Sequence, residues 1–99
     1  MTGLGSRIEV LLPGALAADS GGARRVEVEV AEPARLADVL DALAGRYPLL
    51  GRRLRDETGA LRRHVNVYLG RDDVRGLLGM RTPVSAGDTV LVLPNVAGG

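Results

Sequence analysis

Apolar and polar residues alternate along two stretches in the first third of the chain. Residues 7–12 place apolar side chains at every second position, and RRVEVEV, residues 24–30, does so most regularly. Because the side chains of a β-strand point alternately to the two faces of a sheet, a period of two predicts half-buried strands. Pro13-Gly14 predicts a break and Gly21-Gly22 a turn or flexible loop, so we expect the two strands to pair as a hairpin.

The apolar period changes to that of an α-helix after Pro33, which we place in the first helical turn. Pro48 disfavours the helical conformation of the residue before it, so the helix is predicted to end near residues 45–47. Residues 49–63 are charged and weakly periodic, and we expect a connector there with one irregular turn around Leu50 to Leu54. The helix should bury the residues that recur at its apolar spacing: Leu36, Val39, Leu40, Leu43 and Tyr47.

The remaining strands follow in the last third of the chain. HVNVYLG, residues 64–70, alternates again and predicts a third strand. Turn-forming residues follow it and recur at 86–88, and between them we expect a short strand around Val74. Residues 89–93 predict a last strand that is apolar on both faces, as is usual for a central strand, and Pro94 ends it because it cannot donate to a ladder.

The order of these elements predicts an α+β fold in which a mixed sheet packs on one main helix. If the last strand is central, its neighbour is the first strand, running parallel to it, and the helix supplies part of the crossover that parallel pairing needs. This arrangement is the β-grasp, or ubiquitin-like, topology. We expect one domain over residues 1–93, followed by a flexible C-terminal tail over residues 94–99 that ends in Gly-Gly.

Composition argues against several classes of function. Thirteen basic residues, all arginine, meet twelve carboxylates for a net charge of +1, which argues against a nucleic-acid partner. The arginine pairs are interpreted as solvated surface, with a basic contact patch for an acidic partner as the alternative. No run is long enough to span a bilayer and no cysteine is present, so we expect a cytoplasmic protein without thiolate chemistry or a membrane partner. His64 has no partner ligands and the acidic pairs fall in turns, so we expect no metal site.

The tail from Pro94 to Gly99 has a chemistry of its own. Its residues can extend by about 20 Å, far enough to carry a terminal carboxylate into the active site of a partner. Gly98 and Gly99 have no Cβ atom, so the backbone there can pass through a narrow channel. A carboxylate is a poor electrophile, but once it is coupled to AMP it accepts a thiol, a sulfide equivalent or an amine. Gly-Gly at a chain end is a weak signal by itself, because a frayed end without any function can also carry two glycines.

The surroundings of the tail make this signal specific. SAGDTVLVLPNVAGG, residues 85–99, resembles the end of the ThiS/MoaD family of ubiquitin-like sulfur carriers. In that family a Gly-Asp turn introduces the final strand, a proline ends it and Val-Ala-Gly-Gly closes the chain. RHVNVYLGRDDVR, residues 63–75, is similar to a Val-Asn-x-Tyr segment and an Asp-Val-Arg of the same family. Together with the order of the elements, the resemblance extends over most of the chain from Arg7.

The resemblance implies that the protein is not an enzyme but a co-substrate of partner enzymes. An E1-like adenylyltransferase/sulfurtransferase would use ATP to adenylate the carboxylate of Gly99, and a sulfur donor would convert the adenylate to a thiocarboxylate. The carrier itself would bind no cofactor. The rest of the tail would contact the partner through Gly98, Ala97, Val96 and Pro94.

Asn95 stands where the small subunit of molybdopterin synthase commonly has a second proline. With the long charged connector, this departure is more similar to the CysO-type branch of the family. In that branch the thiocarboxylate attacks O-phosphoserine on a cysteine synthase, and a metalloprotease then releases cysteine. We therefore expect a carrier for cysteine biosynthesis. The large subunit of molybdopterin synthase, or a thiosugar or thiamin synthase, is the alternative sulfur acceptor.

Two questions stay open at this level. Leu91 and Leu93 either lie under a covering layer or form, with Tyr68, an apolar patch near the tail that a partner would bury. The adenylate could also serve a protein modifier that forms amide bonds to other proteins, and an interaction domain with an inert tail is the third class. Because the chain contains no lysine, it cannot form lysine-linked chains with itself.

Overall fold

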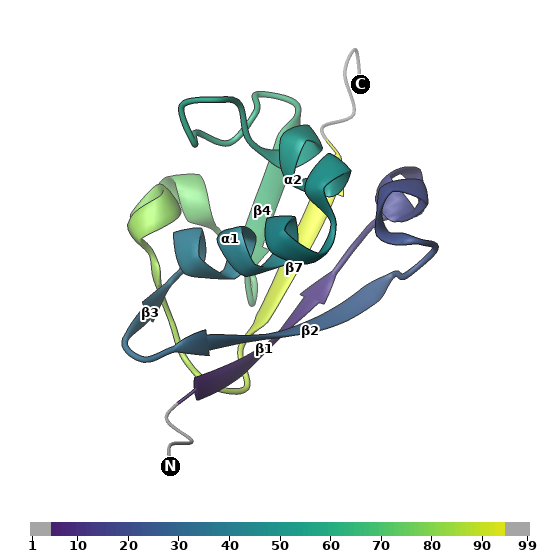
Figure 1. The fold of residues 1–99 in the computed structure, drawn as a ribbon. Coiled ribbons are helices and arrows are strands. Elements are labelled where there is room, and N and C mark those ends of the chain that lie inside the picture. The colour runs from purple at the N-terminus through teal and green to yellow at the C-terminus, as the bar shows by residue number, and fades with distance from the viewer. Residues whose placement is uncertain (1–4, 95–99) are drawn as a thin grey trace.

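The computed structural model describes residues 5–94, and within them the main sheet has five strands. They are β1 (Gly5–Leu11), β2 (Arg25–Ala31), β4 (Val65–Leu69), β5 (Asp72–Asp73) and β7 (Thr89–Pro94). The strand order is β2-β1-β7-β4-β5 (Figure 1). β1 and β2 pair as the predicted antiparallel hairpin, and β7 runs parallel to β1 and antiparallel to β4. The predicted β-grasp topology and the central position of the last strand are confirmed.

Helices α1 (Leu36–Arg46) and α2 (Pro48–Leu54) lie on the same face of the sheet (Figure 1). The apolar stripe of α1 is buried as predicted, except for Tyr47, which follows the helix and is half-buried. The alternating residues of β1, β2, β4 and β7 meet this stripe from the other side. Aliphatic side chains thus build the core, and its fully buried members include Ile8, Val10, Val39, Leu43, Val67, Val90 and Val92.

α1 begins later than predicted, and Pro33 is not part of it. Ala34–Arg35 instead form β3, which pairs with β6 (Pro83–Val84) in a separate two-stranded sheet. The carboxylate of Asp38 accepts a hydrogen bond from the amide of Arg35 at 2.9 Å, so the first helical turn closes onto this residue. The backbone stays extended up to Arg35 because the second sheet holds it there.

A regular helix, α2, stands where an irregular turn was predicted within a connector. Pro48 occupies its first turn, where an amide hydrogen would have no intrahelical partner. Leu50 and Leu54 lie one turn apart on its inner face, and both are buried. Burial of these two side chains, rather than any long apolar period, accounts for the helix.

Short 3₁₀ helices form several of the remaining connections. η1 (Gly14–Ser20) stands between β1 and β2, where a turn or flexible loop was expected. The short strand expected around Val74 lies just before it as β5, and Val74 itself begins η2 (Val74–Gly76). Within residues 5–94, no helix combines the length and the apolar character needed to cross a membrane.

Candidate functional site

The predicted site is the C-terminal tail, and the structure describes the point at which it leaves the sheet. Pro94, the first residue of the predicted tail, is the last residue of β7 and pairs with Val65 at the start of β4. Leu93 pairs with Asn66. We call Leu93 and Pro94 the tail root. The other predicted tail residues of the site lie outside the described residues: Val96, Ala97, Gly98 and Gly99.

β7 fixes the position of the tail root because it is paired on both sides and packed against the core. Val90 and Val92 are fully buried on the helix-covered face. Val90 stands opposite Val10 of β1, and Val92 stands opposite Val67 of β4. A fully buried valine contributes about 1.5–3 kcal/mol. Local opening of β7 would therefore require breaking two ladders and exposing this part of the core.

The opposite face of β7 carries an exposed apolar patch, which answers the first open question. Leu91 and Leu93 point away from the helices, because they alternate with the buried valines of the strand. Leu91 stands opposite Tyr68 of β4 and Leu11 of β1, and these three side chains are half-buried. Leu93 is 38% exposed. We define the sheet-face patch as Leu11, Tyr68, Leu91 and Leu93. It contains three of the predicted partner-binding residues, Tyr68, Leu91 and Leu93, and one residue, Leu11, that the sequence did not single out.

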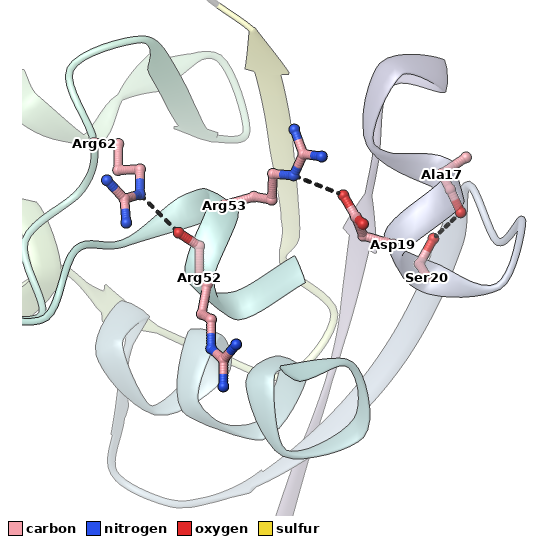
Figure 2. A network of polar contacts seen from close by, with 6 residues as sticks. All are labelled: Ala17, Asp19, Ser20, Arg52, Arg53 and Arg62. Carbon is pink, nitrogen blue, oxygen red and sulfur yellow. Dashed lines mark hydrogen bonds and ion pairs between the residues drawn. The ribbon is translucent and has the colours of Figure 1, made fainter. Parts of the chain in front are cut away.

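Basic residues that sequence reasoning did not place at the site lie on the helix side of the tail root. Figure 2 shows three of them, Arg52, Arg53 and Arg62, with the side chain of Arg52 extending away from the other two. The basic residues line a hollow between the end of α2, η1 and the start of β4, and we call them the arginine collar: Arg52, Arg53, Arg62 and His64. One carboxylate, that of Asp19, also lines the hollow and pairs with Arg53 at 3.1 Å. The sequence feature that could have indicated this cluster was the pair of Arg-Arg dipeptides on either side of one loop. Periodicity, however, does not show that the loop brings the two dipeptides together.

Hydrogen bonds attach the arginine collar to both α2 and the sheet. The Nε atom of Arg62 donates to the carbonyl of Arg52 at 2.7 Å (Figure 2), and the amide of Arg62 donates to the carbonyl of Leu54 at 3.0 Å. The carbonyl of Arg62 in turn accepts from the amide of Val65 and from the guanidinium of Arg75, both at 3.0 Å. The collar is therefore held at a defined place beside β4, the strand that pairs with the tail root.

Hydrogen bonds surround the carboxylate of Asp56, which lies in the loop after α2. The carboxylate accepts hydrogen bonds from the side chain and the amide of Thr58 and from the amide of Ala60. These bonds lower the pKa of the Asp56 carboxyl below its ordinary value of 3.8. They close a turn, so the role of Asp56 is to shape the loop. Among residues 5–94, no three His, Asp or Glu side chains lie close enough together to hold a metal ion.

Comparisons with known proteins find several similar chains. The ThiS family model matches residues 10–99. The chain is 36% identical to the sulfur carrier protein CysO of Mycobacterium tuberculosis, with 93% of this chain and 98% of that protein covered. It is 39% identical to small archaeal modifier protein 1 of Haloferax volcanii, with 83% and 90% covered. A chain in the crystal structure of the Amycolatopsis orientalis BexX/CysO complex superimposes with a TM-score of 0.82 at 35% identity, covering 93% of this chain and 99% of that chain.

Proposed function

The chain belongs to the ThiS family, and from this premise we propose that it is a sulfur carrier that acts through the carboxylate of Gly99. Its similar proteins are named sulfur carrier and small modifier proteins, so we assign it the role of a co-substrate for partner enzymes. The observation that carries the proposal is the tail root. The central strand of the sheet ends at Pro94 beside an exposed apolar patch, and the chain continues from there to Gly98-Gly99.

The proposed reaction has two steps. A carboxylate oxygen of Gly99 attacks the α-phosphorus of ATP on an E1-like enzyme, and pyrophosphate leaves, which gives an acyl adenylate. A sulfide donor then attacks the acyl carbon and AMP leaves, which gives the thiocarboxylate. Neither step needs an oxidant or a reductant. ATP is bound and consumed by the activating enzyme, and the carrier holds no cofactor of its own.

The folded body positions the tail for this chemistry. An extended tail reaches about 20 Å from Pro94, which suits an active site set back from the surface of the partner. The partner would bury the sheet-face patch beside the tail root, as aromatic and aliphatic side chains are buried at the centre of protein interfaces. Tyr68, Leu91 and Leu93 are thus proposed to hold the body against the enzyme while the tail enters it.

We assign the thiocarboxylate to cysteine biosynthesis. It would attack O-phosphoserine on a cysteine synthase-like enzyme, and a metalloprotease would release the product and regenerate the carrier. The identity with CysO of M. tuberculosis over nearly the whole of both chains supports this assignment. The alternative acceptor is the large subunit of molybdopterin synthase or a thiosugar or thiamin synthase. The likeness to a chain of the BexX/CysO complex supports a synthase partner in general, because it places such a carrier with a second protein.

A protein modifier is the second candidate function, because the chain is 39% identical to small archaeal modifier protein 1. The same acyl adenylate would then be transferred to the amine of a lysine on a target protein, and an amide bond would join Gly99 to the target. This chain has no lysine, so it would be attached singly rather than as lysine-linked chains.

Intact-mass measurement after incubation with the E1-like enzyme of the same organism, ATP and sulfide tests the proposal. We expect the full chain to gain the mass difference of one sulfur replacing one oxygen. A variant without Gly99 should form the product at least about 100-fold more slowly, because its carboxylate no longer reaches the reacting phosphorus. Its melting temperature should be unchanged, which controls for folding.

Two results would redirect the proposal. Conjugates to other proteins in a cell extract, without the mass change, would favour the modifier. Normal sulfur transfer by the chain that lacks Gly99 would contradict both candidates, because both require the terminal carboxylate at that position.

A further inference from the structure

The arginine collar has no role in the function proposed above. Its residues and the adjacent Arg63 place four arginines and a histidine around one end of the molecule, where the hollow holds a single carboxylate. Arginines outnumber carboxylates three to one in this hollow, whereas the whole chain has a net charge of only +1. Like charges that lie close together repel and reduce stability, so their concentration at one place calls for a cause.

The helix dipole accounts for only part of the cluster. Arg52 and Arg53 lie in the last turn of α2, where the partial negative charge of the helix end favours cations. Arg62, Arg63 and His64 belong to a different segment, to which this argument does not apply. Arg53 is paired with Asp19, but within the described part of the chain the guanidinium groups of Arg52 and Arg63 have neither an ion pair nor a hydrogen bond.

We propose that the arginine collar docks on an acidic protein surface around the mouth of the activating enzyme's active site, an inference that rests on the proposed function. The location supports it, because His64 directly precedes Val65, and Val65 pairs with Pro94 at the tail root. Any enzyme that draws in the tail must therefore bring its own surface against the collar. The planar guanidinium of arginine matches a carboxylate with two parallel hydrogen bonds.

The collar and the sheet-face patch would contribute differently to docking. The patch lies on the open face of the sheet and the collar on the helix side, so the two surfaces border the tail root from opposite sides. Charges at the rim of an interface mainly raise the rate of association and are screened by salt. The collar should therefore affect how readily the enzyme captures the carrier, and not the adenylation step itself.

The test is ATP–pyrophosphate exchange by the E1-like enzyme of the same organism with charge-reversed carriers. The test variant is Arg52→Glu with Arg63→Glu. Both side chains are exposed, and the hydrogen bonds that attach the collar to α2 and to the sheet do not use their guanidinium groups. The matched control is Arg71→Glu with Arg81→Glu. Both control arginines are exposed, and Arg71 lies beside the start of β7, at the other end of that strand from the tail root.

We expect the test variant to raise the KM for the carrier about tenfold or more at low ionic strength, with kcat unchanged, and the difference to shrink as salt is added. The control should change KM less than about twofold. Arg52→Gln with Arg63→Gln, which removes the charges without reversing them, should give an intermediate KM, and thermal melting should verify that each variant is folded.

Equal KM values for the folded test variant and the control at every salt concentration would overturn the inference and leave the collar as solvated surface or as a contact for the chain's own tail. Failure of the wild-type protein to support any exchange is a different result. It would reject the proposed function, and the inference with it.

Discussion

The side chain of Leu91 is the sharpest single-residue test of the sheet-face patch. Leu91 points away from the core, so Leu91→Asp should fold and lose no more than about 1 kcal/mol of stability. A carboxylate in the centre of an apolar contact would have to be desolvated, so we expect kcat/KM in ATP–pyrophosphate exchange to fall at least about tenfold. Leu78→Asp, the same change at a leucine that is 57% exposed between η2 and η3 (Gly79–Arg81), is the control and should have no effect. Normal activation of folded Leu91→Asp would remove the patch from the account.

At the scale of residues, the sequence was a good guide to which side chains lie on the same face of one strand or helix. It was a poor guide to which residues from different segments lie together in the fold. Alternation put Leu91 and Leu93 on one face of their strand and left open whether that face is covered or forms a patch with Tyr68. The register of β4 and β7 shows that Tyr68 and Leu91 stand opposite each other. The hollow shared by Arg52 and Arg62 was not predictable in this way. Their proximity depends on how the loop between them folds back, and that is set by hydrogen bonds such as Arg62 to the carbonyl of Arg52.

At the scale of elements, the contact between α1 and α2 depends on the missing side chain of Gly51. A Cβ atom at this position would lie 2.5 Å from the Cβ of Ala44, so the two helices would have to separate. We expect Gly51→Ala to destabilise the protein by about 1–3 kcal/mol, despite the better helix propensity of alanine. Gly45→Ala in α1 is the matched control, because its Cβ would meet nothing within 4 Å, and it should be neutral or slightly stabilising. Urea denaturation followed by circular dichroism compares them, and equal stability would show that the helices do not pack as described.

The elements themselves were predicted unevenly, and length explains the difference. α1, β1, β2 and β4 each repeat their apolar period, and β7 is a continuous apolar run, so the type and approximate bounds of these elements followed from the sequence. α2 is seven residues long and buries two leucines, which is too few to show a period, and it was predicted as an irregular turn. β3 and β6 are two residues each, too short to show a pattern, so the helix was predicted to begin at Pro33 instead of after β3.

At the scale of the whole molecule, the topology was predicted from the order of the elements and from the central position assigned to β7. A strand that is apolar on both faces was interpreted as central, and it is central. Yet within β7 only Val90 and Val92 are fully buried, whereas Leu91 is half-buried and Leu93 is exposed. Burial by residues 5–94 therefore does not account for the second apolar face. Its hydrophobic character fits the surface that we propose a partner covers.

The arrangement of the whole molecule also predicts where an added domain is tolerated. β1 and β7 are parallel, so Gly5 and Pro94 lie at opposite ends of the sheet. A domain fused before Met1 should leave ATP–pyrophosphate exchange within about twofold of normal, because it stands away from the tail root and the arginine collar. The same domain fused after Gly99 should reduce exchange more than about 100-fold, because it converts the reacting carboxylate to an amide and blocks entry of the tail. Proteolytic cleavage that restores Gly99 as the last residue should restore the rate, which separates blocking from misfolding. Activation of the uncleaved C-terminal fusion at the rate of the N-terminal fusion would mean that the terminal carboxylate is not the reacting group.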